Sequence, residues 1–409
     1  MERARNDATG LTHVATVSFL ASRAAPSGQF WLALGGGVAL ARAAALRGAA
    51  TGYGAAAAAI LQTVAVMGPA RVNAPLTQAL NAPVLGRLHA RGAGRSVQLL
   101  ACLGIRLVHY AVLGAAFVFV VLGGLDEYTQ SYERLTGWLG FLPSGTAGAL
   151  AMGAVGNVLS ALFFSVVQVA VYRRALSDWP AAADAGATGG APVVAEEAAA
   201  SRSGRFDPRA VVVAACVATA LLRASTAGLL LAGVTAWLVA AWALARGDRG
   251  AVPLGAALAG MLAFAALTGG LLGGAGLDLA LRRAARAALL VAVATWMRAA
   301  AGQDGLREVF RRGLHRLRRL PSAAEAAALL EGLDAGPRLV AAGRGAAARL
   351  GEARLRPVPL ADALCLWVAG EAAGFEAGRA VVGPTLRAAH RDRILVVVAL
   401  APALALLGS

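Results

Sequence analysis

Polar side chains inside apolar segments are the residues of this chain best suited to bind a ligand. An amide group both donates and accepts hydrogen bonds, and an uncompensated polar group is costly in lipid, so such a residue needs a ligand or a partner. Five amides are candidates for a substrate-binding pocket: Gln62, Asn73, Gln78, Asn81 and Asn157. Further polar residues in apolar segments are Arg106, His109 and Gln168.

The run from Asn73 to Asn81 is the strongest pocket candidate, because prolines occur beside and within it. These are Pro69, Pro75 and Pro83. A proline leaves a backbone carbonyl without its helical partner, which is usual where a membrane helix is broken beside a ligand. The alternative for each single amide is a hydrogen bond between helices. The sequence leaves both interpretations open.

The chain lacks the motifs of common catalytic and metal sites. Its five histidines form no HExxH pair, and its three cysteines form no CxxC pair. GxSxG is absent, and so is GxxxxGK[ST], which predicts that the chain does not hydrolyse ATP itself. We expect no enzyme activity, no metal site and no cofactor. Cys102, Cys216 and Cys365 are expected to be small core residues.

Composition indicates the elements that carry these residues. The chain is 58% hydrophobic with a mean hydropathy of +0.65, and 15% of its residues are charged, against about 25% in soluble domains. Residues 145–172, 226–245 and 251–277 carry no charge, and each stretch reaches the roughly 20 residues that span a bilayer. This predicts an all-α, polytopic helical protein of the cell (inner) membrane that crosses the lipid bilayer several times.

The net charge of +16 comes entirely from arginine, because the chain contains no lysine. The arginines lie in short loops and in one block, and they do not alternate with aromatic residues as in proteins that bind single strands. We therefore exclude nucleic acid as a partner. The positive-inside rule places arginine-rich segments in the cytoplasm, so the fifteen arginines of residues 282–356 are all expected there.

A change of composition divides the chain. Residues 179–205 are rich in Ala, Gly, Ser and acids and are predicted to be a flexible linker between two membrane modules, 1–178 and 206–409. The first module is expected to contain five or six spans, from the apolar segments 30–45, 51–67, 76–88, 97–125 and 145–172. Those of the second are expected at 210–222, 226–245, 251–277, 284–297 and 394–407.

Three segments outside these spans receive separate predictions. Residues 13–25 are weakly apolar and are expected to form a cytoplasmic lead-in or an amphipathic helix. Residues 126–134 are polar and are expected to be a solvated loop on the outside. Residues 299–393 are too charged for lipid and are expected to form cytoplasmic helices along or beneath the membrane.

Asp207-Pro208-Arg209 precedes the first span of the second module. Proline in the first turn of a helix loses no hydrogen bond, and aspartate suits the positive helix end. About four spans follow, then the stretch from Leu306 through Leu320-Pro321, the remaining polar helices and a last span. This order resembles the transmembrane T component of energy-coupling-factor (ECF) transporters, which import vitamins and metal ions with separate ATPases. The resemblance covers residues 206–408 and rests mainly on order and spacing.

The resemblance implies two cytoplasmic coupling helices, each with an arginine that docks into an ATPase subunit. In the first helix the candidates are Arg349 and Arg354, each followed by leucine where the family has a small residue. In the second helix residues 371–375 match a Glu-Ala-Arg-Gly-Phe string, but Ala373 stands in the place of the arginine. Arg379, one helical turn beyond, is the candidate substitute. Alanine cannot make the charge-assisted contact of a guanidinium.

These features imply a membrane subunit of an ATP-driven ECF-type importer of a vitamin or metal ion. It would couple separate ATP-binding subunits to a module that binds a small-molecule substrate. Residues 1–178 resemble a substrate-binding S component in size and number of spans; otherwise a separate S component would supply that function. Two alternatives remain. One is a degenerate T-like scaffold without ATPases, which Ala373 keeps open, and the other is a membrane-embedded enzyme acting on a lipid or isoprenoid.

Overall fold

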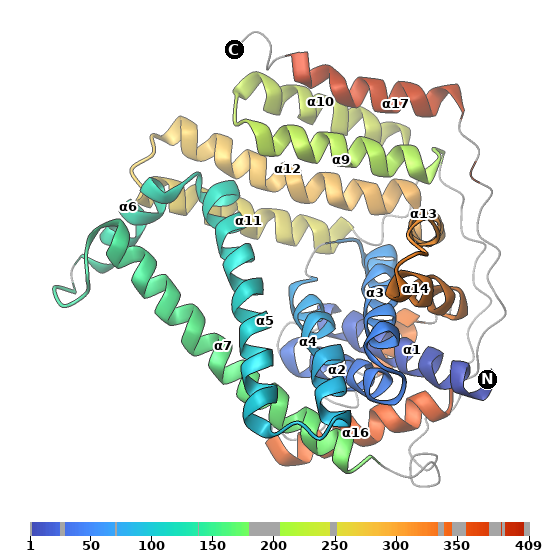
Figure 1. The fold of residues 1–409 in the computed structure, drawn as a ribbon. Helices are drawn as coiled ribbons and strands as arrows, with labels where there is room; N and C mark the ends of the chain where they lie inside the picture. Colours follow the sequence, from blue (N-terminus) through green and yellow to red (C-terminus); the bar gives the residue numbers. More distant parts are fainter. Residues whose placement is uncertain are drawn as a thin grey trace.

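The computed structural model of the chain is a bundle of helices (Figure 1). It describes residues 2–24, 29–69, 72–137, 139–179, 205–245, 252–333, 339–345, 357–375, 386 and 389–404. Helices make up 88% of these residues and no strand occurs among them, which confirms the all-α class.

The helices of the first half are α1 (Glu2–Ala24), α2 (Gln29–Arg47), α3 (Ala49–Met67), α4 (Asn73–Ala90), α5 (Arg95–Ala116) with the π-helix η1 (Phe117–Leu122), α6 (Leu125–Thr136) and α7 (Gly145–Ser177). The helices of the second half are α9 (Pro208–Ala224), α10 (Gly228–Leu244), α11 (Val252–Leu272), α12 (Leu277–Ala301), α13 (Gln303–Arg316), α14 (Pro321–Gly332), α16 (Pro357–Ala373) and α17 (His390–Leu400), with the 3-10 turn η2 (Ala401–Ala403) after it.

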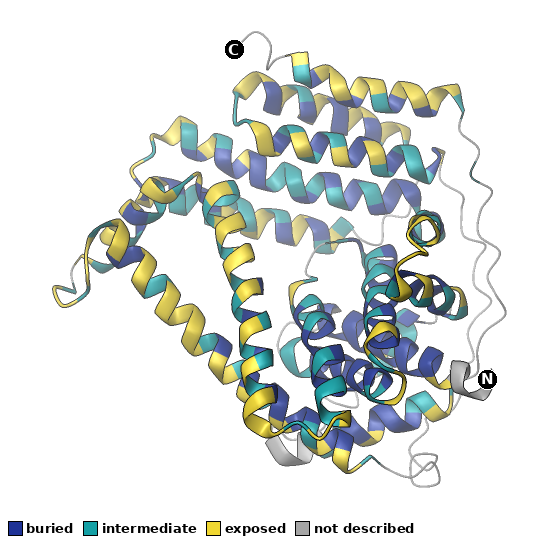
Figure 2. Cartoon of the chain, in the orientation of Figure 1, coloured by how far each residue is buried: buried dark blue, intermediate teal, exposed yellow. Residues whose placement is uncertain are grey.

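Six of the described helices are long and apolar enough to cross a membrane. They are α2, α3, α5 with η1, α7, α11 and α12. Large apolar side chains cover the exposed faces of α5, α7 and α11; examples are Val108, Phe163 and Phe264, each more than 60% exposed. Figure 2 shows these exposed residues along α5 and α7. Such faces fit contact with lipid, and the six candidate spans are consistent with a multi-pass membrane protein.

Helix α1 corrects the prediction for residues 13–25, because it is the buried centre of the first half. All residues from Ala8 to Arg23 are buried. Hydroxyl groups make this possible: Thr12 donates to the carbonyl of Ala8, and Thr16 donates to that of Thr12. Since these hydroxyls are satisfied within their own helix, α1 can be buried although its hydropathy is low. A lead-in or surface helix would leave one side open.

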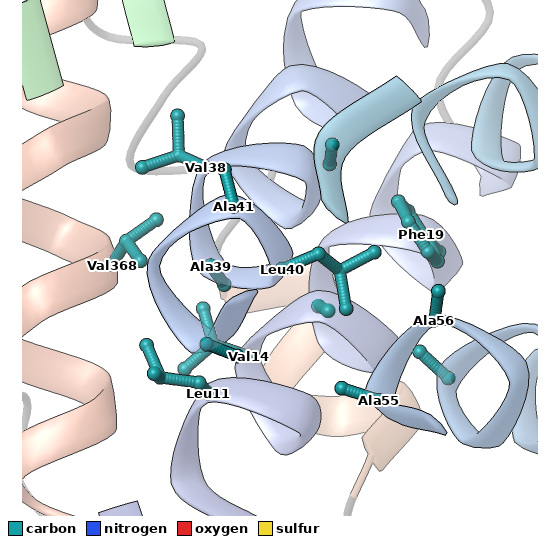
Figure 3. Packing of buried hydrophobic residues seen from close by; sticks show 14 of the residues in the cluster. Leu11, Val14, Phe19, Val38, Ala39, Leu40, Ala41, Ala55, Ala56 and Val368 are labelled. Carbon is teal, nitrogen blue, oxygen red and sulfur yellow. The ribbon is translucent and has the colours of Figure 1, made fainter. Parts of the chain in front are cut away.

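One hydrophobic core, centred on α1, contains residues from both halves of the chain. Leu11 and Val14 of α1 pack with α2 and α3, and Val368 of α16 belongs to the same cluster (Figure 3). Leu330 of α14 and Leu339 are further members from the second half. A second core contains residues of α9, α10, α12 and α17. Helices α14 and α16, expected within the cytoplasmic region 299–393, thus contribute to the core of the first half, while the division into two modules stays a prediction.

Helix α6 corrects the expected solvated loop at 126–134. This segment is helical and contacts the second half. Arg283 of α12 donates to the carboxylate of Glu127 at 2.6 Å, and Ser131 donates to the carbonyl of Gly269 in α11 at 2.8 Å. Glu127 therefore has an ion-pair partner in the second half, and the segment is not simply a solvated loop.

Helix α12 also divides the arginine block that was expected on one side. Arg282, Arg283 and Arg286 lie near its start, and Arg298 lies near its end. At 1.5 Å per residue, 12 to 16 residues separate these groups by roughly 18 to 24 Å. Arg283, Arg286 and Arg298 are also buried against the first half, where Arg286 donates to the carbonyl of Val120 in η1. If α12 crosses the membrane, its first arginines lie away from the side of α13, so their sequence proximity does not place the whole block in the cytoplasm.

Candidate functional site

The structure places the five predicted substrate-binding residues on three helices of the first half and brings only some of them into a common interior. Gln62 of α3 and Gln78 and Asn81 of α4 are buried. Asn73, at the start of α4, is exposed but is held by a side-chain contact to α5. Asn157 lies on the exposed face of α7 among apolar side chains, so it does not join the buried residues.

A chain of hydrogen bonds connects α4, α5 and α7 in the interior. The hydroxyl of Tyr172 donates to Oε1 of Gln78 at 2.6 Å. One helical turn away on α7, Oε1 of Gln168 accepts from Nη2 of Arg106 at 2.5 Å and from Sγ of Cys102 at 3.5 Å. All five side chains are buried, with at most 2% exposure. These five residues are called the polar cluster below.

Arg106 is the electrostatic centre of the polar cluster. It forms no ion pair with a carboxylate in the part of the chain that the structure describes. Its guanidinium instead contacts the oxygens of Gln168 and Tyr110, and it lies 5.7 Å from the ring centroid of Phe164. A buried charge normally has a counter-charge, so an arginine held only by dipoles and an aromatic face favours an anionic ligand.

Several polar atoms in and beside the polar cluster have no described hydrogen-bond partner. Nε2 of Gln78, Nε2 of Gln168, Nε of Arg106 and Oγ of Ser165 are buried and have no hydrogen-bond partner among the described residues. Three of the four are donors only and the fourth can also donate. The site is therefore suited to a small ligand with acceptor atoms, such as a carboxylate or a carbonyl.

Tyr172 and Cys102 belong to the polar cluster but were absent from the predicted pocket. Helical spacing carries the signal that could have revealed them, because residues four positions apart share a helix face. Gln168 with Tyr172, and Cys102 with Arg106, have this spacing. Cys102 and Cys365 are buried core residues, as expected, whereas Cys216 is exposed and that expectation was wrong. Cys102 is also a donor within the polar cluster.

Beside the polar cluster, His109 Nε2 and Asn73 Oδ1 lie 2.7 Å apart and tie α5 to the start of α4. The proline-flanked run therefore has one end at this contact and the other at Asn81, which donates to the carbonyl of Thr77 in its own helix. Of the run's three amides, Gln78 alone has a described hydrogen bond to the polar cluster. The hydrogen bond of Asn73 fits the interhelical alternative, and that of Asn81 lies within its own helix.

Two buried arginines meet the last turn of α3. Arg23 of α1 donates to the carbonyl of Gly68 at 2.7 Å, and Nε of Arg298 donates to that of Val66 at 2.7 Å. The final carbonyls of a helix have no partner within it and carry partial negative charge, so cations stabilise this end. The contact fixes α12 to the helix that carries Gln62.

The three predicted ATPase-docking residues, Arg349, Arg354 and Arg379, lie outside the described residues. The described part of the region begins with α13 and α14, which are held together by Arg307. Its guanidinium donates to the carbonyl of Leu333 at 2.8 Å and to that of Leu330. Between the two helices, residues 317–320 form an exposed turn, Leu-Arg-Arg-Leu, with Leu317 55% and Leu320 57% exposed.

Glu308 is the anionic centre of α13. It is buried and accepts hydrogen bonds from Arg311 at 2.8 Å and from Arg312 at 2.6 Å. The hydrogen bond from Arg311 is the main cause that lowers the pKa of this carboxyl below its ordinary value, and Arg312 adds to it. Glu308 therefore remains ionised and forms ion pairs with two of the arginines of α13, Arg311 and Arg312.

The Asp207-Pro208-Arg209 sequence begins α9 as predicted. The carboxylate of Asp207 accepts from the backbone N–H of Arg209 at 2.8 Å and from its guanidinium. The contact to α17 is new: the backbone N–H of Asp207 donates to Asp392 at 2.9 Å. The sequence thus caps one helix and joins it to the last one.

Comparisons with protein-family models, with curated proteins and with solved structures find no match for this chain.

Proposed function

We propose that this chain is the membrane subunit of an ATP-driven ECF-type importer that carries substrate-binding and coupling parts in one polypeptide. The observation that carries the proposal is the shared core of the first half, in which Leu330 of α14 and Val368 of α16 pack with Leu11 of α1. Of the helices that would receive motion from ATPases, α16 contacts α7, which holds part of the polar cluster, and α14 contacts α1 and α3 of the same core.

Close packing is what makes this arrangement a coupling device. Protein interiors are dense and transmit displacement instead of absorbing it. A shift of α14 would move α3, against which it packs: a Cβ added at Gly54 of α3 would lie 2.6 Å from the Cβ of Glu325. Arg298 and Val66 provide a second connection between the same halves. Displacement of the coupling helices would thus reach the interior of the first half.

The polar cluster supports an organic anion as the substrate. Arg106 would repel a metal cation, and the polar atoms without a described partner in and beside the polar cluster are chiefly donors, which suit carboxylate or carbonyl oxygens. Among the two substrate classes of the family, a vitamin-like acid therefore fits this site better than a metal ion. The amides of Gln78 and Gln168 would orient it.

The test is affinity purification of the tagged full chain from its native membrane in mild detergent, with mass spectrometry of co-purifying proteins. We expect two P-loop ATPases, which are lost in the Arg349→Glu and Arg354→Glu variants. Arg223→Glu serves as a matched control, because this exposed arginine lies at the opposite end of α9 from α13. Absence of ATPases from the folded wild-type chain would reject the ATP-driven importer.

A specific contact favours the degenerate scaffold as second candidate. Residues 371–375 lack the family arginine, and Phe375 lies against His13 of α1 with ring centroids 4.5 Å apart. The segment that would dock an ATPase therefore packs partly on the chain itself. Recovery of the chain alone, with Arg349→Glu and Arg354→Glu indistinguishable from wild type, would support the scaffold over the importer. No observation among the described residues favours the enzyme alternative.

A further inference from the structure

A groove of about 170 Å³ lies between the start of α9, α10 and α17, far in sequence from the polar cluster. Its walls include Trp237 and Leu244 of α10 and Ile394 and Val398 of α17, and Arg205 and Arg391 also line it. Leu244, Ile394 and Val398 are each 45 to 50% exposed. An apolar groove with such exposed walls is suited to hold part of an acyl chain.

The two lining arginines have no described carboxylate as a partner. Arg205 and Arg391 are exposed, and neither forms an ion pair with a described carboxylate. The neighbouring acids are occupied: Asp207 accepts from Arg209, and Asp392 accepts from the backbone N–H groups of Asp207 and Ala389. Two guanidinium groups without a carboxylate partner, beside an apolar groove, are complementary to an anionic lipid: the arginines suit its headgroup and the groove suits its acyl chain.

The position of the groove agrees with this chemistry. Arg205 and Arg391 lie at the beginning of α9 and α17, and Pro208 is adjacent to α13, where an added Cβ at Gly305 would lie 2.6 Å from Cγ of Pro208. This is the end of the bundle that carries the basic helix α13, with Arg318 and Arg319 in the turn after it. Under the positive-inside rule it faces the cytoplasmic leaflet, in which anionic lipids are enriched.

We propose that this groove binds an anionic phospholipid, with its phosphate on Arg205 and Arg391 and one acyl chain along Trp237, Ile394 and Val398. The bound lipid would bridge α10 and α17, so it would hold the last helix against the bundle. The proposal does not depend on the importer function, because it concerns only the lipid-facing side of the second half.

Native mass spectrometry of the purified, delipidated full chain tests this site. The probes are phosphatidylglycerol and phosphatidylcholine with identical acyl chains, added in equal amounts. We expect at least tenfold more phosphatidylglycerol adduct, reduced to the phosphatidylcholine level in Arg205→Gln/Arg391→Gln. The control Arg47→Gln/Arg223→Gln removes the same charge from exposed positions elsewhere and should keep the adduct.

A third variant tests the acyl chain separately. Ala240 lines the groove and is exposed, so Ala240→Trp fills the groove without a change of charge and should also reduce the adduct. Elution volume and thermal midpoint establish that every variant is folded. Equal adducts for the two lipids, equal loss in the control pair, or full binding by Ala240→Trp would each overturn the proposal.

Discussion

Arg298 and Val66 are 232 positions apart in the chain, yet Nε of Arg298 donates to the carbonyl oxygen of Val66 at 2.7 Å. The bond joins the longest helix of the second core to the end of α3, and Arg23 donates to Gly68 at the same end. A helix end inside a membrane protein needs partners for its last carbonyls. Here a residue from each half supplies them, so the halves depend on one another for stability.

Replacement of Arg298 should therefore destabilise the whole protein. We expect Arg298→Leu to lower the free energy of unfolding by about 1.5–3 kcal/mol, the range for hydrogen bonds to charged groups, because the carbonyl of Val66 stays buried. Thermal or denaturant unfolding in detergent measures it. Arg282→Leu is the matched control on the same helix: its partner, Asp278, is exposed, and the change should be about 0.5 kcal/mol or less. Equal losses would contradict the special role of Arg298.

The shared core predicts that the two halves stay associated after the chain is cut. A protease site inserted after Gly190 would separate residues 1–190 from the rest. We expect an affinity tag on the first fragment to retain the second, because Leu330 and Leu339 lie in the first core and Arg174 contacts Asp362 at 2.6 Å.

We expect the two fragments to stay together through the apolar contact of Leu330 and not through the ion pair of Arg174. Leu330→Arg places a charge at a position with 0% exposure and should release the second fragment, whereas Arg174→Gln removes only an exposed ion pair and should not. Separation of the cut wild-type chain in mild detergent would show that the linker, not the core, holds the halves together.

Glu308 predicts a pH dependence of stability. Its pKa is lower in the folded chain than in the unfolded one, because Arg311 and Arg312 donate to the ionised form. This contribution is complete above the ordinary value near pH 4.5 and is lost as the pH falls through the lowered pKa. We expect the thermal midpoint of the wild type to fall below about pH 4.5 more steeply than that of Glu308→Gln. Glu325→Gln, a carboxylate without an ion pair among the described residues, should keep the wild-type slope.

Long apolar runs made most of the helices predictable. Residues 30–45, 51–67 and 145–172 correspond to α2, α3 and α7, since about 20 apolar residues leave little choice but a helix in a membrane. Helix α1 was missed for the opposite reason. Thr12 and Thr16 lower its hydropathy, while their hydroxyl bonds to the helix backbone, which hydropathy does not register, allow burial.

The sequence indicated which polar residues of the candidate site are buried, but not which of them form hydrogen bonds with one another. Gln62, Gln78 and Asn81 are buried as their apolar context indicated. Tyr172 was missed because a tyrosine before two arginines at the end of an apolar run is typical of a membrane interface. Its pairing with Gln78, 94 positions away, is set by the packing of α4 against α7, which sequence spacing does not contain.

Gly37 provides the most direct test of that packing. An added Cβ would lie 1.6 Å from the hydroxyl of Tyr172, so alanine must displace the hydroxyl and break its 2.6 Å bond to Gln78. We expect Gly37→Ala to lower the free energy of unfolding by about 1–3 kcal/mol, as overpacking does, and to cost less in a Tyr172→Phe background, because the hydroxyl and its bond are then already absent. Gly104→Ala on α5 is the control: no neighbouring atom lies within 4 Å of its added Cβ, and alanine is the better helix former by up to about 1 kcal/mol. If both alanine variants unfold at the same temperature in detergent, Tyr172 does not lie against Gly37, and the polar cluster must be arranged differently.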